Sequence, residues 1–289
     1  MKHLLCFGLG YSGRALAARL AAQGWRITGT SRTAEGAAVI AALGYNAFVF
    51  DGTAPISPQA FKGVTHIVAS VTPDVGGDPV LRHHTGSLEA HAGEIEWLAY
   101  LSTTGVYGDR GGEWVTEESE LAPNTERGRR RLEAETGWLE LHRRHALPAH
   151  IFRLAGIYGP GRNQLVCLLE GTAKRIIKPG QVFSRIHVAD IANVLEASIA
   201  RPNPGAAYNV CDDEPCPPQD VMVHAAKLLQ VPLPPAIPFE EAQLSPMARS
   251  FYADSKRVSN SRIKEELGVA LLYSNYRDGL AALARDLKR

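Results

Sequence analysis

The sequence predicts an α/β fold built on a doubly wound parallel sheet, with a smaller lobe toward the C-terminus. Short apolar segments alternate with segments of helical periodicity from residue 3 to residue 154, the pattern of repeated strand and helix units. The first apolar segment ends in a glycine-rich turn, Gly8-Leu9-Gly10-Tyr11-Ser12-Gly13, that leads into a helix. This turn, between a strand and a helix, is typical of a Rossmann-type dinucleotide-binding unit.

Each glycine of this turn has a steric reason to be there. Gly8 can make the tight turn, Gly10 lets the backbone approach a pyrophosphate, and Gly13 lets the helix pack closely on the strand. The helix N-terminus adds free N–H groups and a positive dipole end. We therefore predict cofactor contacts from these three glycines and from Tyr11 and Ser12. A turn that serves only as a tight connection is the alternative.

The second strand, residues 25–30, leads to Ser31 and Arg32. A site for NAD usually has an Asp or Glu there, on the ribose 2′-hydroxyl. A hydroxyl and a guanidinium instead suit a 2′-phosphate, which a carboxylate would repel. We therefore expect NADP rather than NAD as the cofactor, although Arg32 could simply be a solvated residue after a strand.

Composition argues against several classes of protein. The 289 residues are 45% hydrophobic, enough for a sizeable core, and 31 basic residues balance 30 acidic ones, so no bulk charge favours nucleic acid or membrane. No apolar run approaches a membrane span and no signal-peptide pattern is present, so a cytoplasmic location is expected. The four cysteines lack metal-site spacing, and we predict no metal site.

The next elements follow in order, each bounded by turn residues or by a change of periodicity. We predict a helix over 34–43 that Gly44 stops, strands over 47–50 and 64–71, a helix over 79–92, a strand over 95–101, a long helix over 124–145 and a strand over 147–154. Parallel strands place their carboxyl ends at one edge of the sheet, where ligands bind. Residues that follow the strands are therefore candidates for the site.

Two groups of such residues stand out. Asp51, Gly52 and Ser70 should border the adenine and ribose, although Asp51 could instead cap the next element. Strand 95–101 brings Ser102, Thr103 and Tyr107 to the same edge. These residues belong to the segment that follows the strand, Ser102-Thr103-Thr104-Gly105-Val106-Tyr107-Gly108. Hydroxyls there can hydrogen-bond a carbonyl or alkoxide near a nicotinamide, or can merely satisfy backbone groups at a strand end.

The rest of the chain divides between two units. A helix over 187–200 and a strand over 207–210 are expected to return to the sheet and complete a nucleotide-binding domain formed by residues 1–157. Residues 158–186 and 211–289, with helices near 218–230, 256–267 and 275–288, are expected to form the small substrate-binding lobe.

Several separated blocks together resemble the NAD(P)-dependent epimerase/dehydratase family, the extended short-chain dehydrogenase/reductases. These blocks are the serine-rich Leu101–Gly108 segment, the Arg153–Arg162 segment with its Tyr-Gly-Pro-Gly sequence, Ile186–Ala192, and Tyr208–Val210 with Lys256–Gly268. The resemblance runs in consistent order from residue 3 to about residue 285. It implies a nicotinamide cofactor, oxidoreductase chemistry and a substrate such as a nucleotide sugar.

Two departures from the family pattern stand out. Phe7 replaces the first glycine of the usual family motif. The helix that should carry the catalytic Tyr-x-x-x-Lys pair has Arg127 and Arg131 at those positions. Guanidinium stays protonated, so Arg127 cannot shuttle a proton, and Thr103, which matches the catalytic Ser/Thr of the family, loses its partner.

The loss of the pair resembles an atypical bacterial subgroup, the YeeZ-like proteins, that keeps the fold without it. Tyr107 or Tyr158 as a relocated phenol is an alternative. The arginines suggest an anionic ligand instead: Arg127 and Arg131 from the long helix, with Arg153, Arg162 and Arg185 and the nearby Tyr158 as candidate substrate contacts. For Arg131 the simpler interpretation is an ion pair with Glu135, four residues on, and Arg129 and Arg130 are expected to be solvated.

Two functions therefore remain open. The first is an atypical oxidoreductase acting on an anionic small molecule, with Thr103 and Tyr107 near the reacting carbon and Arg127 as stabiliser of an anion or oxyanion. The second is a catalytically silent NADP(H)-binding protein that changes shape or partners with the state of the cofactor. A homodimer is the assembly considered, and neither nucleic acid nor membrane is expected as a partner.

Overall fold

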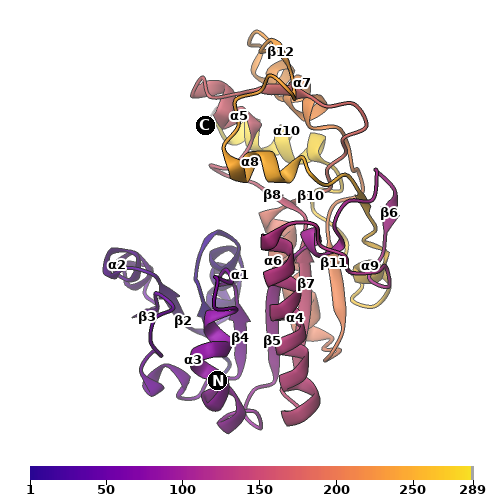
Figure 1. The fold of residues 1–289 in the computed structure, drawn as a ribbon. Coiled ribbons are helices and arrows are strands. Elements are labelled where there is room, and N and C mark those ends of the chain that lie inside the picture. Colours follow the sequence, from indigo (N-terminus) through magenta and orange to yellow (C-terminus); the bar gives the residue numbers. More distant parts are fainter. Residues whose placement is uncertain (288–289) are drawn as a thin grey trace.

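A seven-stranded sheet, parallel throughout, forms the centre of the protein (Figure 1). The structure is a computed structural model that describes residues 1–287. The strands lie in the order β11-β7-β5-β4-β1-β2-β3. Their bounds are β1 His3–Phe7, β2 Arg26–Ser31, β3 Asn46–Val49, β4 His66–Ala69, β5 Trp97–Thr103, β7 Ala149–Leu154 and β11 Ala207–Val210. The predicted doubly wound sheet is confirmed, because the order reverses direction at β1 and β4.

Helices cover both faces of this sheet, because the side chains of β1 point alternately to one face and the other. Leu4 and Cys6 point into one core, which α1 (Tyr11–Ala22), α2 (Ala34–Ala42) and α6 (Val188–Ala200) cover. Leu5 and Phe7 point into the other, which α3 (Pro79–Ala90), α4 (Glu126–His145) and the short η1 (Pro58–Phe61) cover. Successive strand residues face opposite sides, so two buried faces explain why Leu4, Leu5, Cys6 and Phe7 of β1 are all apolar.

A smaller lobe lies beyond the carboxyl ends of the strands, at the top of Figure 1. It contains the helices α5 (Gln164–Leu169), α7 (Pro218–Leu229), α8 (Pro246–Phe251) and α10 (Tyr276–Asp286). It also contains two pairs of strands: β8 (Gly156–Tyr158) pairs with β10 (Arg185–His187), and β9 (Arg175–Ile177) pairs with β12 (Ala236–Pro238). Leu165, Val221 and Leu280 belong to its own apolar core. The lobe is therefore positioned to cover a ligand held at the sheet edge.

One segment expected in the lobe packs against the main domain instead. The predicted helix over 256–267 is wrong at its start, because Arg257–Val258 is the strand β13, which pairs with β6 (Trp114–Val115) in the segment between β5 and α4. Helix α9 (Ser261–Glu265) follows, and Ile263, Leu267 and Val269 join the core beneath α6. A two-residue strand has no periodicity, so pairing between such distant segments leaves no local pattern.

Within residues 1–287, no helix combines the length and the apolar character that a membrane crossing needs.

Candidate functional site

The glycine turn has the geometry that its sequence suggested. Gly8 adopts a φ of +80°, and its N–H donates to Thr30 Oγ1 at 2.8 Å. A Cβ on Gly13 would lie 2.8 Å from Cys6 Sγ, so only glycine permits this contact between α1 and β1. Gly10, by contrast, has open space: the nearest atom to its Cβ position would be Gly8 O, at 3.9 Å. The positive φ explains Gly8 and packing explains Gly13, but neither explains Gly10.

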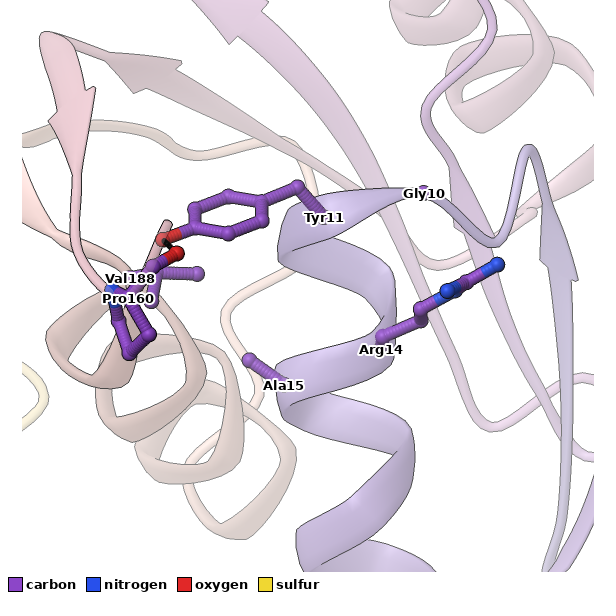
Figure 2. Close-up of a pocket in the computed structure, with 6 residues that line it drawn as sticks. All are labelled: Gly10, Tyr11, Arg14, Ala15, Pro160 and Val188. Carbon is purple, nitrogen blue, oxygen red and sulfur yellow. Dashed lines mark hydrogen bonds between the residues drawn. The ribbon is translucent and has the colours of Figure 1, made fainter. Parts of the chain in front are cut away.

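A pocket of about 510 Å³ opens at the N-terminus of α1 (Figure 2). It is lined by Gly10, Tyr11, Arg14, Ala15, Pro160 and Val188. Gly10 is the N-cap without a side-chain cap, and no acidic residue lies in the first turn, so the helix presents free N–H groups there. Tyr11 closes one side by donating its hydroxyl to Pro160 O at 3.0 Å, and Arg14 points to the other side.

These features fit a phosphate group of a dinucleotide. An uncapped helix N-terminus attracts anions, and Arg14, one turn into the helix, adds a positive charge. Ser12 is buried in the first turn of α1. Arg14 is missing from the predicted site, although its position one helical turn after Gly10 is visible in the sequence.

The residues expected around the adenosine lie at the carboxyl ends of β2, β3 and β4. Ser31 ends β2, and Arg32 is exposed, with no ion pair among residues 1–287. Ser70, after β4, donates its N–H to Phe7 O at 2.9 Å. The positions agree with a ribose and adenine site, and the choice between NAD and NADP stays a prediction.

Asp51 holds a local turn and does not cap the next element, η1, whose N-cap is Ser57. Its Oδ1 accepts from Thr53 N at 2.9 Å and from Thr53 Oγ1 at 2.7 Å, and these bonds lower the pKa of this exposed carboxyl. Gly52 has a φ of +88°, and its carbonyl accepts from Arg82 Nη2 at 2.9 Å. Both residues thus form a turn that α3 holds in place, at the edge where the adenine is expected.

A buried polar network lies beneath the carboxyl end of β5. Ser102 Oγ donates to Glu135 Oε1 at 2.5 Å, and Arg153 Nη2 donates to Glu135 Oε2 at 2.9 Å. Arg153 Nη1 donates to the hydroxyl of Tyr107 at 2.9 Å, and that hydroxyl donates to Asn209 Oδ1 at 2.7 Å. All five side chains are buried. The network joins α4, β5, β7 and β11.

This network changes the expected roles of three residues. Tyr107 was expected near the reacting carbon, but its hydroxyl faces the interior, and burial raises its pKa to about 12. Arg153 was expected to contact substrate, but Glu135 neutralises it. Ser102 was expected to contact the cofactor, but its hydroxyl is bonded to the same carboxylate. A buried charge must be paired, and the sheet interior supplies the partners.

Tyr158 and Arg185, expected as substrate contacts, are also buried. The hydroxyl of Tyr158 lies against α10, where a Cβ on Gly279 would come within 2.1 Å of it, and burial raises its pKa well above the usual range. Arg185 Nη1 donates to Phe183 O at 2.9 Å and to Cys216 O at 3.3 Å. Both predictions are corrected, because these side chains complete the lobe core and its connection to β10.

Asp212, beside Arg185, should make stability depend on pH. It is 1% exposed, and burial raises its pKa to about 7, above the value of about 4 in an unfolded chain. The folded protein then binds the extra proton between about pH 4 and 7, so stability falls as the pH rises through this window. The side chain of the Asp212→Asn variant stays neutral at every pH. The variant should therefore avoid this loss of stability, which is at most about 4 kcal/mol.

Melting temperatures of wild type and Asp212→Asn at pH 5 and pH 8 test this expectation. The advantage of the variant over wild type should be larger at pH 8 than at pH 5. A difference between Asp212→Asn and wild type that is equal at both pH values would contradict it.

Arg131 does not form the ion pair with Glu135 that the helical spacing suggested. Glu135 is occupied by Arg153 and Ser102. Arg131 Nη1 instead donates to Leu101 O at 2.7 Å, and Nη2 donates to Thr72 Oγ1 at 3.3 Å. The guanidinium is therefore held at the carboxyl ends of β4 and β5, where a nicotinamide ribose is expected.

Arg127 lies one turn before Arg131 on α4 and keeps no carboxylate partner among residues 1–287. Its guanidinium stacks over the Phe251 ring of α8, 5.2 Å from the centroid. Desolvation lowers the pKa of Arg127 most, and the positive charges of Arg131 and Arg162 lower it further. Arg162, exposed in the turn after β8, lies over the Tyr11 ring at 5.9 Å. No sequence signal points to Phe251.

The hydroxyl of Thr103 satisfies a backbone group at the end of its strand, one of the two roles that its sequence allowed. The residue ends β5 half-buried, and its Oγ1 accepts from Gly105 N at 3.2 Å, which caps the short η2 (Thr104–Tyr107). The hydroxyl nevertheless lies at the sheet edge, in the same strand end as Ser102. The edge thus combines Thr103, two arginines of α4 and the uncapped end of α1.

Comparisons with known proteins find one matching family profile and several similar proteins. A profile described as the NAD dependent epimerase/dehydratase family matches residues 88–211. The structure of a functionally unknown conserved protein from Silicibacter pomeroyi is 55% identical, with both chains covered in full and a TM-score of 0.92. Protein YeeZ from Escherichia coli K12 is 27% identical over 239 residues, 73% of this chain and 78% of YeeZ.

The fold also matches an enzyme of known cofactor. The dTDP-glucose 4,6-dehydratase from Bacillus anthracis, solved in complex with NAD, has a TM-score of 0.80 over all of this chain and 97% of that chain. The two chains are 17% identical, so this likeness concerns the fold alone.

Proposed function

Because the chain belongs to the NAD-dependent epimerase/dehydratase family, we propose that it binds a nicotinamide dinucleotide at the N-terminus of α1 and acts as an atypical oxidoreductase on a small anionic molecule. The observation that carries this proposal is the open Cβ position of Gly10 beside an uncapped helix end and a pocket. A structural turn has no need for that space. A pyrophosphate does, because it must approach the backbone closely.

The proposed roles follow from where each side chain lies. Gly8 shapes the turn, Gly10 and Tyr11 border the pyrophosphate, and Arg131 faces the nicotinamide ribose from the ends of β4 and β5. The bound cofactor would supply hydride transfer. Arg127 would stabilise negative charge on the substrate, since it cannot give up its proton, and the Thr103 hydroxyl would hydrogen-bond the reacting oxygen.

One observation favours the alternative, a catalytically silent NADP(H)-binding sensor. The two tyrosines that could have replaced the missing phenol, Tyr107 and Tyr158, are buried and turned away from the sheet edge. An oxidoreductase that reduces a carbonyl needs a proton donor near the new hydroxyl. Turnover of any substrate would exclude the sensor, and tight cofactor binding with a cofactor-dependent change of association would support it.

The cofactor and its type are tested together by titration with NADPH and NADH, followed by nicotinamide fluorescence. We expect NADPH to bind about 10- to 100-fold more tightly than NADH, the effect of one or two charge-assisted hydrogen bonds to the 2′-phosphate. Arg32→Ala should remove this preference without weakening NADH. Arg26→Ala, at the other end of β2, is the matched control and should keep the wild-type preference.

Each outcome of this titration has a distinct meaning. Equal affinities in wild type would remove the argument for NADP while keeping the dinucleotide site. Failure of both cofactors to bind would contradict the site itself, and with it the proposed function.

A further inference from the structure

The side chain of Tyr11 joins the glycine turn of the main domain to the lobe. Its hydroxyl donates to Pro160 O at 3.0 Å, although 149 residues separate the two in the sequence (Figure 2). The neighbouring side chains of the turn stay in the main domain, since Leu9 belongs to its core and Ser12 is buried in α1. Tyr11 therefore carries a contact from the proposed cofactor site into a different part of the molecule.

Gly159, the first residue after β8, makes room for the tyrosine hydroxyl. A Cβ at this position would lie 2.5 Å from Tyr11 Oη and 2.7 Å from Val188 Cγ1. Both distances are well inside the roughly 3.5–4 Å of a normal contact. A side chain here would push away the tyrosine or the start of α6, so the close approach of the lobe to the main domain depends on glycine at this position.

Hydrogen bonds hold residues 159–162, which we call the lobe turn, in one conformation. Gly159 N donates to Arg162 O at 3.0 Å, and Arg162 N donates to Gly159 O at 3.1 Å. Asn163 Nδ2 also donates to Gly159 O, at 2.8 Å. A displacement of Pro160 would therefore move the lobe turn as a unit, the behaviour of an element that can carry coupling between two sites.

Asn163 connects the lobe turn to the core of the lobe. Its Oδ1 accepts from Leu165 N at 2.9 Å and from Val166 N at 3.2 Å, and these bonds cap α5. Leu165, in the first turn of α5, and Tyr158, directly before the lobe turn, both belong to the lobe core. A continuous path of contacts thus runs from the N-terminus of α1 through Tyr11, the lobe turn and Asn163 to that core.

The pocket of Figure 2 takes its walls from both ends of this path. Gly10, Tyr11 and Arg14 lie at the start of α1, whereas Pro160 belongs to the lobe turn. A ligand in the pocket would contact both parts, so it would bind more tightly when the lobe turn is docked on Tyr11 than when it is not. Such a difference in contacts is what allows a ligand to shift a conformational equilibrium.

We propose that Tyr11 is a positioning residue that couples dinucleotide binding to the placement of the lobe. A dinucleotide at the N-terminus of α1 holds Tyr11 against Pro160, and the lobe turn and α5 gain order with it. By linkage, a change that loosens the lobe turn weakens the dinucleotide by the same factor. The inference rests on the proposed function only for the identity of the ligand at α1.

Hydrogen exchange of the full chain, followed by mass spectrometry, measures the order of α5. Without cofactor, Tyr11→Phe should raise the exchange rate of the peptide over residues 163–169 about 3- to 10-fold, the value of one neutral hydrogen bond. Tyr45→Phe is the matched control, because it removes the same hydroxyl from the segment before β3 and should leave this rate unchanged.

The same peptide reports the coupling when NADPH is added. Saturating NADPH should slow its exchange about 3- to 10-fold in wild type and less than about twofold in Tyr11→Phe. Nicotinamide fluorescence establishes saturation for each protein, so a weaker affinity in the variant cannot imitate the loss of coupling. A tyrosine that only stabilised the fold would leave the effect of NADPH equal in both proteins.

Asn163→Ala tests the path from the side of the lobe. It separates the lobe turn from α5 and lies outside the pocket, yet it should weaken NADPH about 3- to 10-fold through linkage. Asn275→Ala is the matched control, because Asn275 caps α10 of the same lobe by accepting from Asp278 N at 3.0 Å. It should change NADPH affinity less than about twofold.

The outcomes separate this inference from the proposed function. Equal protection by NADPH in wild type and Tyr11→Phe would overturn the coupling, and so would bound NADPH that leaves the exchange of residues 163–169 unchanged. An equal loss of NADPH affinity in Asn163→Ala and Asn275→Ala would assign the effect to general loosening of the lobe and would also overturn it. Failure of NADPH to bind any of these proteins would contradict the proposed function, whereas faster exchange in Tyr11→Phe would still support the positioning role.

Discussion

Gly10→Val is expected to weaken nicotinamide dinucleotide binding at least about 100-fold while leaving the protein folded. The new side chain has room, since the nearest atom to its Cβ would be Gly8 O at 3.9 Å and the backbone of Gly10 is extended with a φ of −89°. It would occupy the mouth of the pocket, however, and hold a pyrophosphate away from the N–H groups of α1. Loss of two charge-assisted hydrogen bonds accounts for a factor of this size.

Fluorescence titration with NADPH and a thermal melt measure the two effects separately. Gly86→Val is the matched control, because Gly86 lies in α3 with open space around its Cβ position and should keep wild-type cofactor affinity. Gly13→Val should behave in the opposite way to Gly10→Val and lose about 1–3 kcal/mol of stability through its clash with Cys6 Sγ. Wild-type NADPH affinity in Gly10→Val would contradict the placement of the cofactor.

Arg153→Met is expected to have the largest effect on stability. It leaves the Glu135 carboxylate, 2% exposed, without its ion-pair partner, and breaking one partner of a buried pair costs about 3–5 kcal/mol. The hydroxyl of Tyr107 loses a donor at the same time. In a chain of this size, the melting temperature should fall by roughly 5–15 °C.

The double variant Arg153→Met with Glu135→Leu distinguishes a buried-charge effect from simple loss of packing. Because it removes both charges, it should recover most of the stability that the single variant loses. Arg129→Gln breaks a half-exposed ion pair and should change stability by less than about 1 kcal/mol. A double variant no more stable than Arg153→Met alone would show that packing, and not the unpaired carboxylate, causes the loss.

Local sequence determined the scaffold of this protein. The alternation of apolar strands and helices, together with Gly8 and Gly13 between the first strand and helix, was enough to predict the doubly wound sheet, and the structure confirms it. Strand periodicity and the need for a positive φ or a close helix contact act over a few residues. The turn that would hold a cofactor could therefore be identified before any tertiary contact was known.

Tertiary structure alone decided which polar side chains face the cleft. The sequence places Glu135 four residues after Arg131, yet Glu135 pairs with Arg153, eighteen residues away in β7, and leaves Arg131 to the strand ends. The same packing turns Tyr107 toward Asn209. Helical spacing allows an ion pair between Arg131 and Glu135 but does not ensure that it forms. A buried carboxylate needs a cationic partner, and here the register of the sheet places Arg153 next to Glu135.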